Sequence, residues 1–275
     1  MKVGEVDSAD SGVVGNMREG VLAQKFLLTG VDGSPNNYLL NVGRTGAGGW
    51  STPRHRHNFD QVRFVLKGRY PIAKGKVMEE GWVGYFPESV HYGPQDRPDG
   101  LEMMVCQFGG ASGQGFLSVA QREAANDALK QIGEFKNGIF TYIDENGQKH
   151  NQDGSEACIE KATGKKIAYA KPRYDDIVLM DPGNYDWIPG DAPGVHKKML
   201  GVFTERLTQL ELIRIDAGAT YTAGRASSIE LMFMSEGQID VQGKTYGPRS
   251  AFEFQPQEGP VPMKAAEPCT FLRLV

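Results

Sequence analysis

The chain alternates between short runs of apolar, β-branched and aromatic residues and clusters of turn residues. Alternation with a period of two is typical of strands that bury one face, and pairs such as Asp32-Gly33 and Asp99-Gly100 are typical of the turns between them. The pattern therefore predicts an all-β protein. The predicted strands are residues 25–28, 38–42, 61–66, 82–86 and 101–107, followed by 199–203, 209–215, 229–234, 238–241 and 271–274.

One segment breaks this pattern in the middle of the chain. Residues 118–132 are spaced as a helix, with Ser118 as the N-cap, Arg122 and Glu123 on a polar face, and Gly133 as the stop. The following residues, up to 176, are polar and rich in turns, with room for one short helical turn. The expected organisation is a first barrel over residues 1–115, a helical and irregular linker over 116–176, and a second barrel over 177–275.

An internal repeat supports this division. A constant shift of 169 residues places Gly68 on Gly237 and Phe64 on Phe233, and it keeps a proline and a second aromatic residue in register. The two halves are therefore expected to share one strand plan.

Composition excludes several classes of partner. The 275 residues are 40% hydrophobic, the net charge is −4, and no block of Lys and Arg could neutralise a row of phosphates, so we expect no nucleic-acid partner. No apolar run approaches the roughly 18 residues of a membrane span, and the first residues do not resemble a signal peptide. We therefore expect a cytoplasmic protein without a membrane partner. The three scattered cysteines are expected to be reduced, buried thiols.

The most informative segment runs from Gly49 to Gly68. Two histidines, His55 and His57, stand at i and i+2 on an extended stretch, so both imidazoles should face one side and can meet one metal ion. Gln61 follows after a turn and begins a strand in which Gln61 and Arg63 share a face.

This segment resembles the first motif of the cupin family, in which a Gly, His-x-His, a Glu and a Gly occur at the spacing of Gly49, His55-x-His57, residue 61 and Gly68. The departure is Gln61, where the family usually has Glu. The second cupin motif is matched more loosely. Gly81 and Pro87 fit it, whereas Ser89 stands in a glycine position and His91 comes one residue early.

The resemblance implies two cupin barrels, that is, double-stranded β-helix or jelly-roll barrels. It also implies that His55, His57, Gln61 and His91 bind one divalent transition metal inside the first barrel. Three imidazoles and one oxygen donor suit Fe(II) or Mn(II), which we favour, as well as Zn, Ni or Co. At the shifted positions the second barrel has Gly224, Ala226, Glu230 and Pro260, so we expect no metal there.

Further candidates follow from strand alternation. Arg63 should face the interior, where it would bind a substrate carboxylate or pair with an inner acid such as Glu102. Tyr38 and Tyr92 are candidate catalytic residues that would line the pocket and donate a phenolic hydrogen bond. Asp60 and Glu88 are alternative general bases, although alternation directs Asp60 away from the interior.

Three functions remain open at this stage. The resemblance favours a dioxygenase acting on a small, oxygen-rich organic anion. The alternatives are a non-redox metal-dependent lyase or isomerase, which the neutral Gln61 slightly favours, and a small-molecule-binding protein without catalysis. Exposed sheet edges of cupin barrels are commonly covered in dimers, so we expect a homodimer.

Overall fold

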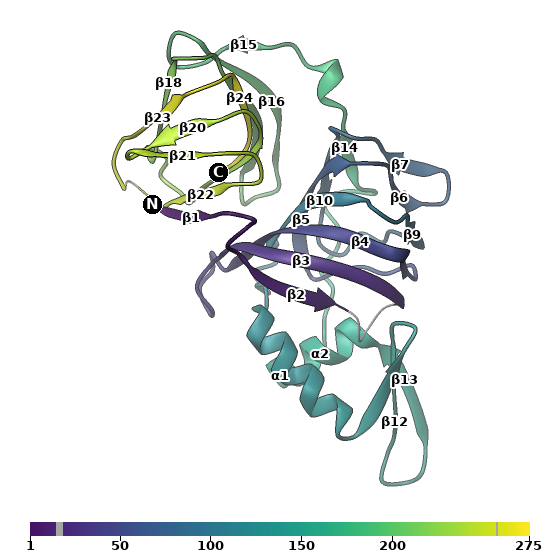
Figure 1. The fold of residues 1–275 in the computed structure, drawn as a ribbon. Helices are drawn as coiled ribbons and strands as arrows, with labels where there is room; N and C mark the ends of the chain where they lie inside the picture. Colours follow the sequence, from purple (N-terminus) through teal and green to yellow (C-terminus); the bar gives the residue numbers. More distant parts are fainter. Residues whose placement is uncertain (15–18, 257) are drawn as a thin grey trace. The chain divides into compact units, whose positions relative to one another are not determined.

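A computed structural model describes residues 1–14, 19–256 and 258–275. It divides into two compact units (Figure 1). The first unit comprises Ser11–Gln24 and Thr29–Leu179, and the second comprises Met1–Asp10, Lys25–Leu28 and Met180–Val275. The expected all-β class is confirmed, since strands dominate both units and only two α-helices are present in the described part of the chain.

The first unit is built on an eight-stranded sheet with a short hairpin beside it. Its central strands carry alternating apolar residues, so that one face of each strand packs into a core that includes Val65, Ile72, Phe86 and Met103. The strand order is β14 (Val178–Met180), β8 (Val83–Phe86), β5 (Phe59–Lys67), β10 (Glu102–Gly109), β4 (Tyr38–Thr52), β3 (Glu19–Thr29) and β2 (Asp10–Val14), with β9 (Gln95–Arg97) on β4 and a hairpin of β6 (Tyr70–Ala73) and β7 (Lys76–Met78).

The segment expected to be an irregular linker is an ordered insert of the first unit (Figure 1). It contains α1 (Val119–Lys130), α2 (Gly154–Thr163) and a three-stranded sheet of β11 (Gly133–Lys136), β12 (Ile139–Ile143) and β13 (Lys149–Asp153). β11 and β13 were missed because they are short and mostly polar. β12 was missed because its apolar run, Ile-Phe-Thr-Tyr-Ile, is only five residues long and does not alternate with polar residues. The insert has a small core of its own, made of Ala125, Leu129, Phe140, Ala157 and Cys158.

Local sequence explains where both helices begin. Ser118 caps α1, because its hydroxyl accepts from the Gln121 amide at 3.1 Å while the Gln121 side chain accepts from the Ser118 amide at 3.0 Å. Asp153 caps α2 by accepting from the amides of Ser155 and Glu156, at 2.9 and 3.2 Å, and Gly164 ends that helix in the left-handed conformation. The predicted start of the first helix is confirmed, whereas Gly133 begins a strand and Gln131 is the C-cap.

The second unit contains a seven-stranded sheet and a four-stranded sheet. It also contains a short 3₁₀ helix, η1 (Pro182–Asn184). The order of the larger sheet is β1 (Lys2–Gly4), β22 (Ala251–Phe254), β19 (Glu230–Glu236), β24 (Cys269–Leu274), β17 (Thr208–Ile215), β16 (Val195–Phe203) and β15 (Ile188–Pro189), and that of the smaller is β18 (Thr220–Ala223), β23 (Val261–Ala265), β20 (Ile239–Val241) and β21 (Lys244–Tyr246).

The expected boundaries at 115 and 176 therefore do not match the structure. Strand β1 pairs with β22, which assigns the first ten residues to the second unit, and the insert belongs with the first barrel. An edge strand supplied from a distant part of the chain leaves no local signal in the sequence.

The repeat is visible in the strand order of the two units. The path β8-β5-β10-β4 of the first unit has its counterpart in β22-β19-β24-β17 of the second, and the hairpin β6-β7 has its counterpart in β20-β21. Each of these pairs is related by approximately the shift of 169 residues seen in the sequence. Equivalent interior positions of the two units can therefore be compared directly.

Candidate metal and substrate site

His55 and His57 lie together at the end of the first barrel. Their ring centroids are 5.0 Å apart and the rings meet edge to face. The Nδ1 atom of His55 is 2.7 Å from the Pro53 carbonyl oxygen, which can only accept a hydrogen bond. The neutral His55 ring therefore carries its proton on Nδ1 and its lone pair on Nε2. A backbone carbonyl that holds one imidazole nitrogen in this way is a common support for a metal-binding histidine.

Tyr92, rather than His91, completes the group. A β-bridge joins Tyr92 to His55, with two backbone hydrogen bonds of 2.9 Å, and places the Tyr92 ring 4.4 Å from the His55 ring and 5.9 Å from the His57 ring. Tyr92 is the residue at the position where the cupin motif has its last histidine, because His91 comes one residue early.

His91 itself is exposed and lines a different surface cavity with Arg54 and Lys171. Because neighbouring residues of an extended chain point to opposite sides, the bridge through Tyr92 directs His91 away from His55. The expected set of three imidazoles is therefore not assembled. Within residues 1–14, 19–256 and 258–275, no group of three or more His, Cys, Asp or Glu side chains is placed to hold a metal ion.

Gln61 is buried in the interior, as alternation predicts, but its amide contacts protein groups. Its Oε1 accepts from Arg63 at 2.7 Å and from Gln107 at 3.4 Å, while its Nε2 donates to the Tyr92 hydroxyl at 3.0 Å. The structure thus gives Gln61 a positioning contact to Tyr92 in place of the expected free oxygen donor.

Arg63 faces the same interior and is almost fully buried. Its guanidinium donates to the hydroxyls of Tyr92, at 2.9 Å, and Tyr70, and it lies 4.3 Å from the centre of the Phe86 ring. The expected alternative pairing with Glu102 is absent, since Arg63 forms no ion pair in the described residues. Burial lowers the pKa of Arg63 to about 10, with a smaller lowering contribution from Arg97, so the group stays charged at neutral pH.

A second arginine, Arg97, was not singled out from the sequence. It is fully enclosed beside Tyr70 and donates to the side chain of Gln95 at 3.1 Å, and burial lowers its pKa to about 10. It too lacks an acidic partner among the residues that the structure describes. The alternation of residues along β9 could have indicated that Arg97 is buried, because Gln95 and Arg97 lie on the same buried face of this strand. Two buried cations without a carboxylate are costly to a fold, which points to an anionic ligand.

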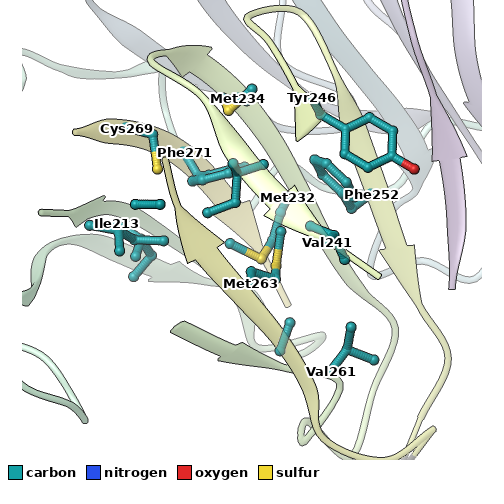
Figure 2. Packing of buried hydrophobic residues seen from close by; sticks show 14 of the residues in the cluster. Ile213, Met232, Met234, Val241, Tyr246, Phe252, Val261, Met263, Cys269 and Phe271 are labelled. Atoms are coloured by element: carbon teal, nitrogen blue, oxygen red, sulfur yellow. The ribbon is translucent and has the colours of Figure 1, made fainter. Parts of the chain in front are cut away.

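The second unit shows that the barrel does not require these polar residues. At the positions equivalent to Arg63, Tyr70 and Tyr92 it has Met232, Ile239 and Val261, all members of one apolar core. Figure 2 shows Met232 and Val261 packed among the other side chains of this core.

The second unit has a buried acidic residue, Glu230, and an arginine of the same unit neutralises its charge. Glu230, the counterpart of Gln61, accepts from Arg273 at 2.6 Å, and Arg273 also donates to Glu211 at 2.7 Å. The arginine therefore lies between two carboxylates. Burial lowers its pKa, but Tyr221 together with Glu230 and Glu211 outweighs burial and raises the pKa above the ordinary value.

The remaining candidates lie away from the histidines. Tyr38 is on the opposite face of the sheet from Gln61 and lines a separate cavity with Asn37 and Ser118, because an even-numbered position of β4 alternates away from the interior. Asp60 is fully buried and accepts from the Tyr85 hydroxyl at 2.6 Å, on the face that alternation predicted.

Glu88 is also engaged in the structure. Its carboxylate accepts from the Ser112 amide at 2.7 Å and from the Ser112 hydroxyl at 2.6 Å. A carboxylate held by such contacts orders a loop, so neither Asp60 nor Glu88 is placed as a general base for the interior.

Comparison with solved structures places the fold. Over its whole length the chain is similar to a candidate dioxygenase from Nostoc punctiforme, with a TM-score of 0.64 and 13% identity, and covers 82% of that chain. It is also similar to Bacillus subtilis oxalate decarboxylase, with a TM-score of 0.56 and 14% identity over 76% of that chain. The chain has a cupin fold.

No protein-family model and no curated protein matches the sequence. No helix in the described part of the chain is long and apolar enough to span a membrane.

Proposed function

We propose that the first unit is a metal-dependent cupin enzyme that acts on a small, oxygen-rich organic anion. The proposal depends on one arrangement: two adjacent imidazoles and a phenol face an interior whose buried charges, Arg63 and Arg97, are both positive. At the positions equivalent to Arg63, Tyr70 and Tyr92 the second unit has apolar core residues, so function rather than folding accounts for these three polar side chains.

The residues present fit a divalent transition metal. With its Nδ1 directed at the Pro53 carbonyl, His55 carries its lone pair on Nε2, His57 adjoins it, and the Tyr92 hydroxyl supplies an oxygen, so the proposed ligands are His55, His57 and Tyr92. Two nitrogen donors and one oxygen donor leave positions for substrate and suit Fe(II) or Mn(II), with Zn, Ni and Co as further options. Such an ion would supply Lewis acidity and, for Fe(II) or Mn(II), a redox couple.

The protein's own groups would bind and orient the anion. Arg63 and Arg97 together carry two positive charges that no described carboxylate neutralises, and a guanidinium binds a carboxylate through paired hydrogen bonds. Gln61 and Arg63 both donate to Tyr92 and so hold its hydroxyl in place.

Dioxygenase chemistry is the expected reaction, and a non-redox lyase is the second candidate. A candidate dioxygenase and a decarboxylase with Mn(II) centres share this fold, which supports both. The two buried arginines favour a carboxylate substrate and are compatible with either. A binding protein without catalysis is the third possibility.

Oxygen uptake separates these candidates. Protein reconstituted with Fe(II) or Mn(II) would be screened against hydroxy acids, oxo acids, dicarboxylates, catechols and β-diketones, with oxygen and substrate both followed. Oxygen use coupled to substrate loss supports the dioxygenase, and substrate loss without oxygen supports the lyase. Binding without any loss of substrate would contradict the enzymatic proposal. An Arg63→Met variant is the control, because it should abolish turnover in either case.

A further inference from the structure

A small cavity lies where the helical insert meets the first barrel. Its volume is about 80 Å³, and it is lined by His57, Asn58 and Gln107 from the barrel and by Arg122, Ser155 and Cys158 from the insert. His57 thus contributes both to this cavity and to the proposed metal site. The function proposed above does not use the cavity.

Arg122 is the charged group of this cavity. Sequence patterning placed it on the polar face of α1, but its Nε atom is buried and has no hydrogen-bond partner, and its guanidinium forms no ion pair with any described residue. Its contact is with the Phe116 ring, 5.4 Å from the guanidinium carbon. Burial lowers the pKa of Arg122, with Cys158 and Glu123 opposing the shift, as expected for a cation enclosed without a counter-ion.

The backbone position of Arg122 is set by the cap of α1. It lies one residue beyond Gln121, whose side chain closes the capping box with Ser118, so the first turn of α1 is well ordered. A partly buried cation without a counter-ion is a costly feature, and a ligand with an anionic group would offset that cost.

A second polar group in the cavity complements Arg122. The Oδ1 atom of Asn58 is buried and accepts no hydrogen bond in the described structure, while its Nδ2 makes a long contact of 3.5 Å to Gln114. The cavity therefore presents one charged donor and one neutral acceptor. A molecule with a carboxylate and a neighbouring hydroxyl would satisfy both.

An aromatic wall connects this cavity with the histidines. The His57 ring stacks on Phe59 at 4.6 Å, and Phe59 meets Phe116 edge to face at 5.1 Å, directly beneath Arg122. A ligand that lies along this wall would reach from the proposed metal site to the guanidinium.

We propose that this cavity is a recognition subsite, in which Arg122 binds a carboxylate at the end of the substrate distant from the metal and Asn58 accepts from an adjacent hydroxyl. The inference rests on the proposed function, and it narrows the substrate class to short aliphatic hydroxy dicarboxylates. Because a water molecule takes about 30 Å³ and a benzene-binding cavity about 150 Å³, a volume of about 80 Å³ holds a carboxylate and a short carbon segment but not an aromatic ring.

Calorimetric titration of the full-length, metal-loaded protein with malate, succinate and propionate tests this subsite. The wild type is expected to bind malate most tightly, then succinate, then propionate. Arg122→Met should weaken malate binding at least tenfold while leaving propionate binding and metal content unchanged. Asn58→Leu should remove the preference for malate over succinate. Arg69→Met is the matched control, because Arg69 is an exposed residue of the same unit paired with Glu79.

The outcomes separate this inference from the proposed function. Malate binding that is equal in the wild type and Arg122→Met, or absent from a metal-loaded wild type, overturns the subsite. Malate binding that depends on Arg122 in a protein that takes up no metal supports the subsite and contradicts the metal-dependent function. Thermal unfolding verifies that Arg122→Met is folded, and removal of an uncompensated buried charge should leave its stability unchanged or higher.

Discussion

His55 and Tyr92 face each other across a β-bridge, with their rings 4.4 Å apart and their backbone groups joined by two hydrogen bonds of 2.9 Å. The bridge fixes which residue after Pro87 enters the interior. Because of the bridge, Tyr92 points into the interior and the neighbouring His91 does not, so Tyr92 replaces His91 in the proposed set of ligands.

Replacement of Tyr92 by Phe tests that selection. The change removes the oxygen that accepts from Gln61 and Arg63, and with it a proposed ligand, so metal affinity should fall by about tenfold or more. Competition with a chelator measures the change. Tyr85→Phe is the control, since the Tyr85 hydroxyl donates to Asp60 on the opposite face of the sheet, and its metal affinity should equal that of the wild type.

Replacement of His91 by Ala should leave the metal content unchanged. His91 is exposed and lines a cavity with Arg54 and Lys171, away from His55 and His57. Elemental analysis of the purified variant checks this expectation. A loss of metal comparable to that in His55→Ala would restore the three-histidine set and contradict the role given to Tyr92.

Replacement of Arg63 by Met introduces the residue that the second unit has at the equivalent position. The variant should fold with a free energy of unfolding within about 2 kcal/mol of the wild type, because the loss of three hydrogen bonds is offset by removal of an unpaired buried charge. Its affinity for carboxylates should be lost. Denaturant unfolding and calorimetry measure the two effects, and retained carboxylate binding would show that the interior cation does not recognise the ligand.

The three cysteines should be unreactive in the native protein. All three are buried and form no disulfide, and burial raises the pKa of Cys158 to about 11, that of Cys269 to about 12 and that of Cys106 further. At pH 8 the thiolate fraction of Cys158 is then about one in a thousand. Mass spectrometry after iodoacetamide treatment should find no label in native protein and three labels after unfolding. Rapid native labelling of any one thiol would contradict the burial.

The strand pattern and the repeat were predictable because period-two alternation reports directly which face of a strand is buried. The predicted strand over residues 61–66 lies within β5, with Gln61 and Arg63 on the interior face. Alternation could not exclude Tyr38, because the run Tyr-Leu-Leu-Asn-Val has apolar residues on both faces. The pairing of Leu39 with Gln107, and of Gln107 with Gln61, shows that Leu39 faces inward and Tyr38 outward.

The third ligand that we propose, Tyr92, was not predictable from spacing. A shift of one residue reverses the side on which a side chain lies, and only the bridge to His55 shows that Tyr92 points inward. Arg122 was missed for a related reason. A charged residue on a polar helix is normally exposed, and the insert that encloses Arg122 is held by long-range packing that leaves no local pattern.

Elemental analysis of protein purified without chelators tests the central claim most directly. We predict about one divalent transition-metal ion per chain in the wild type, and almost none in a His55→Ala, His57→Ala double variant that keeps the thermal unfolding profile of a folded protein. Equal metal content in the two proteins, or a wild type that takes up no metal even when Fe(II) or Mn(II) is supplied, would contradict it.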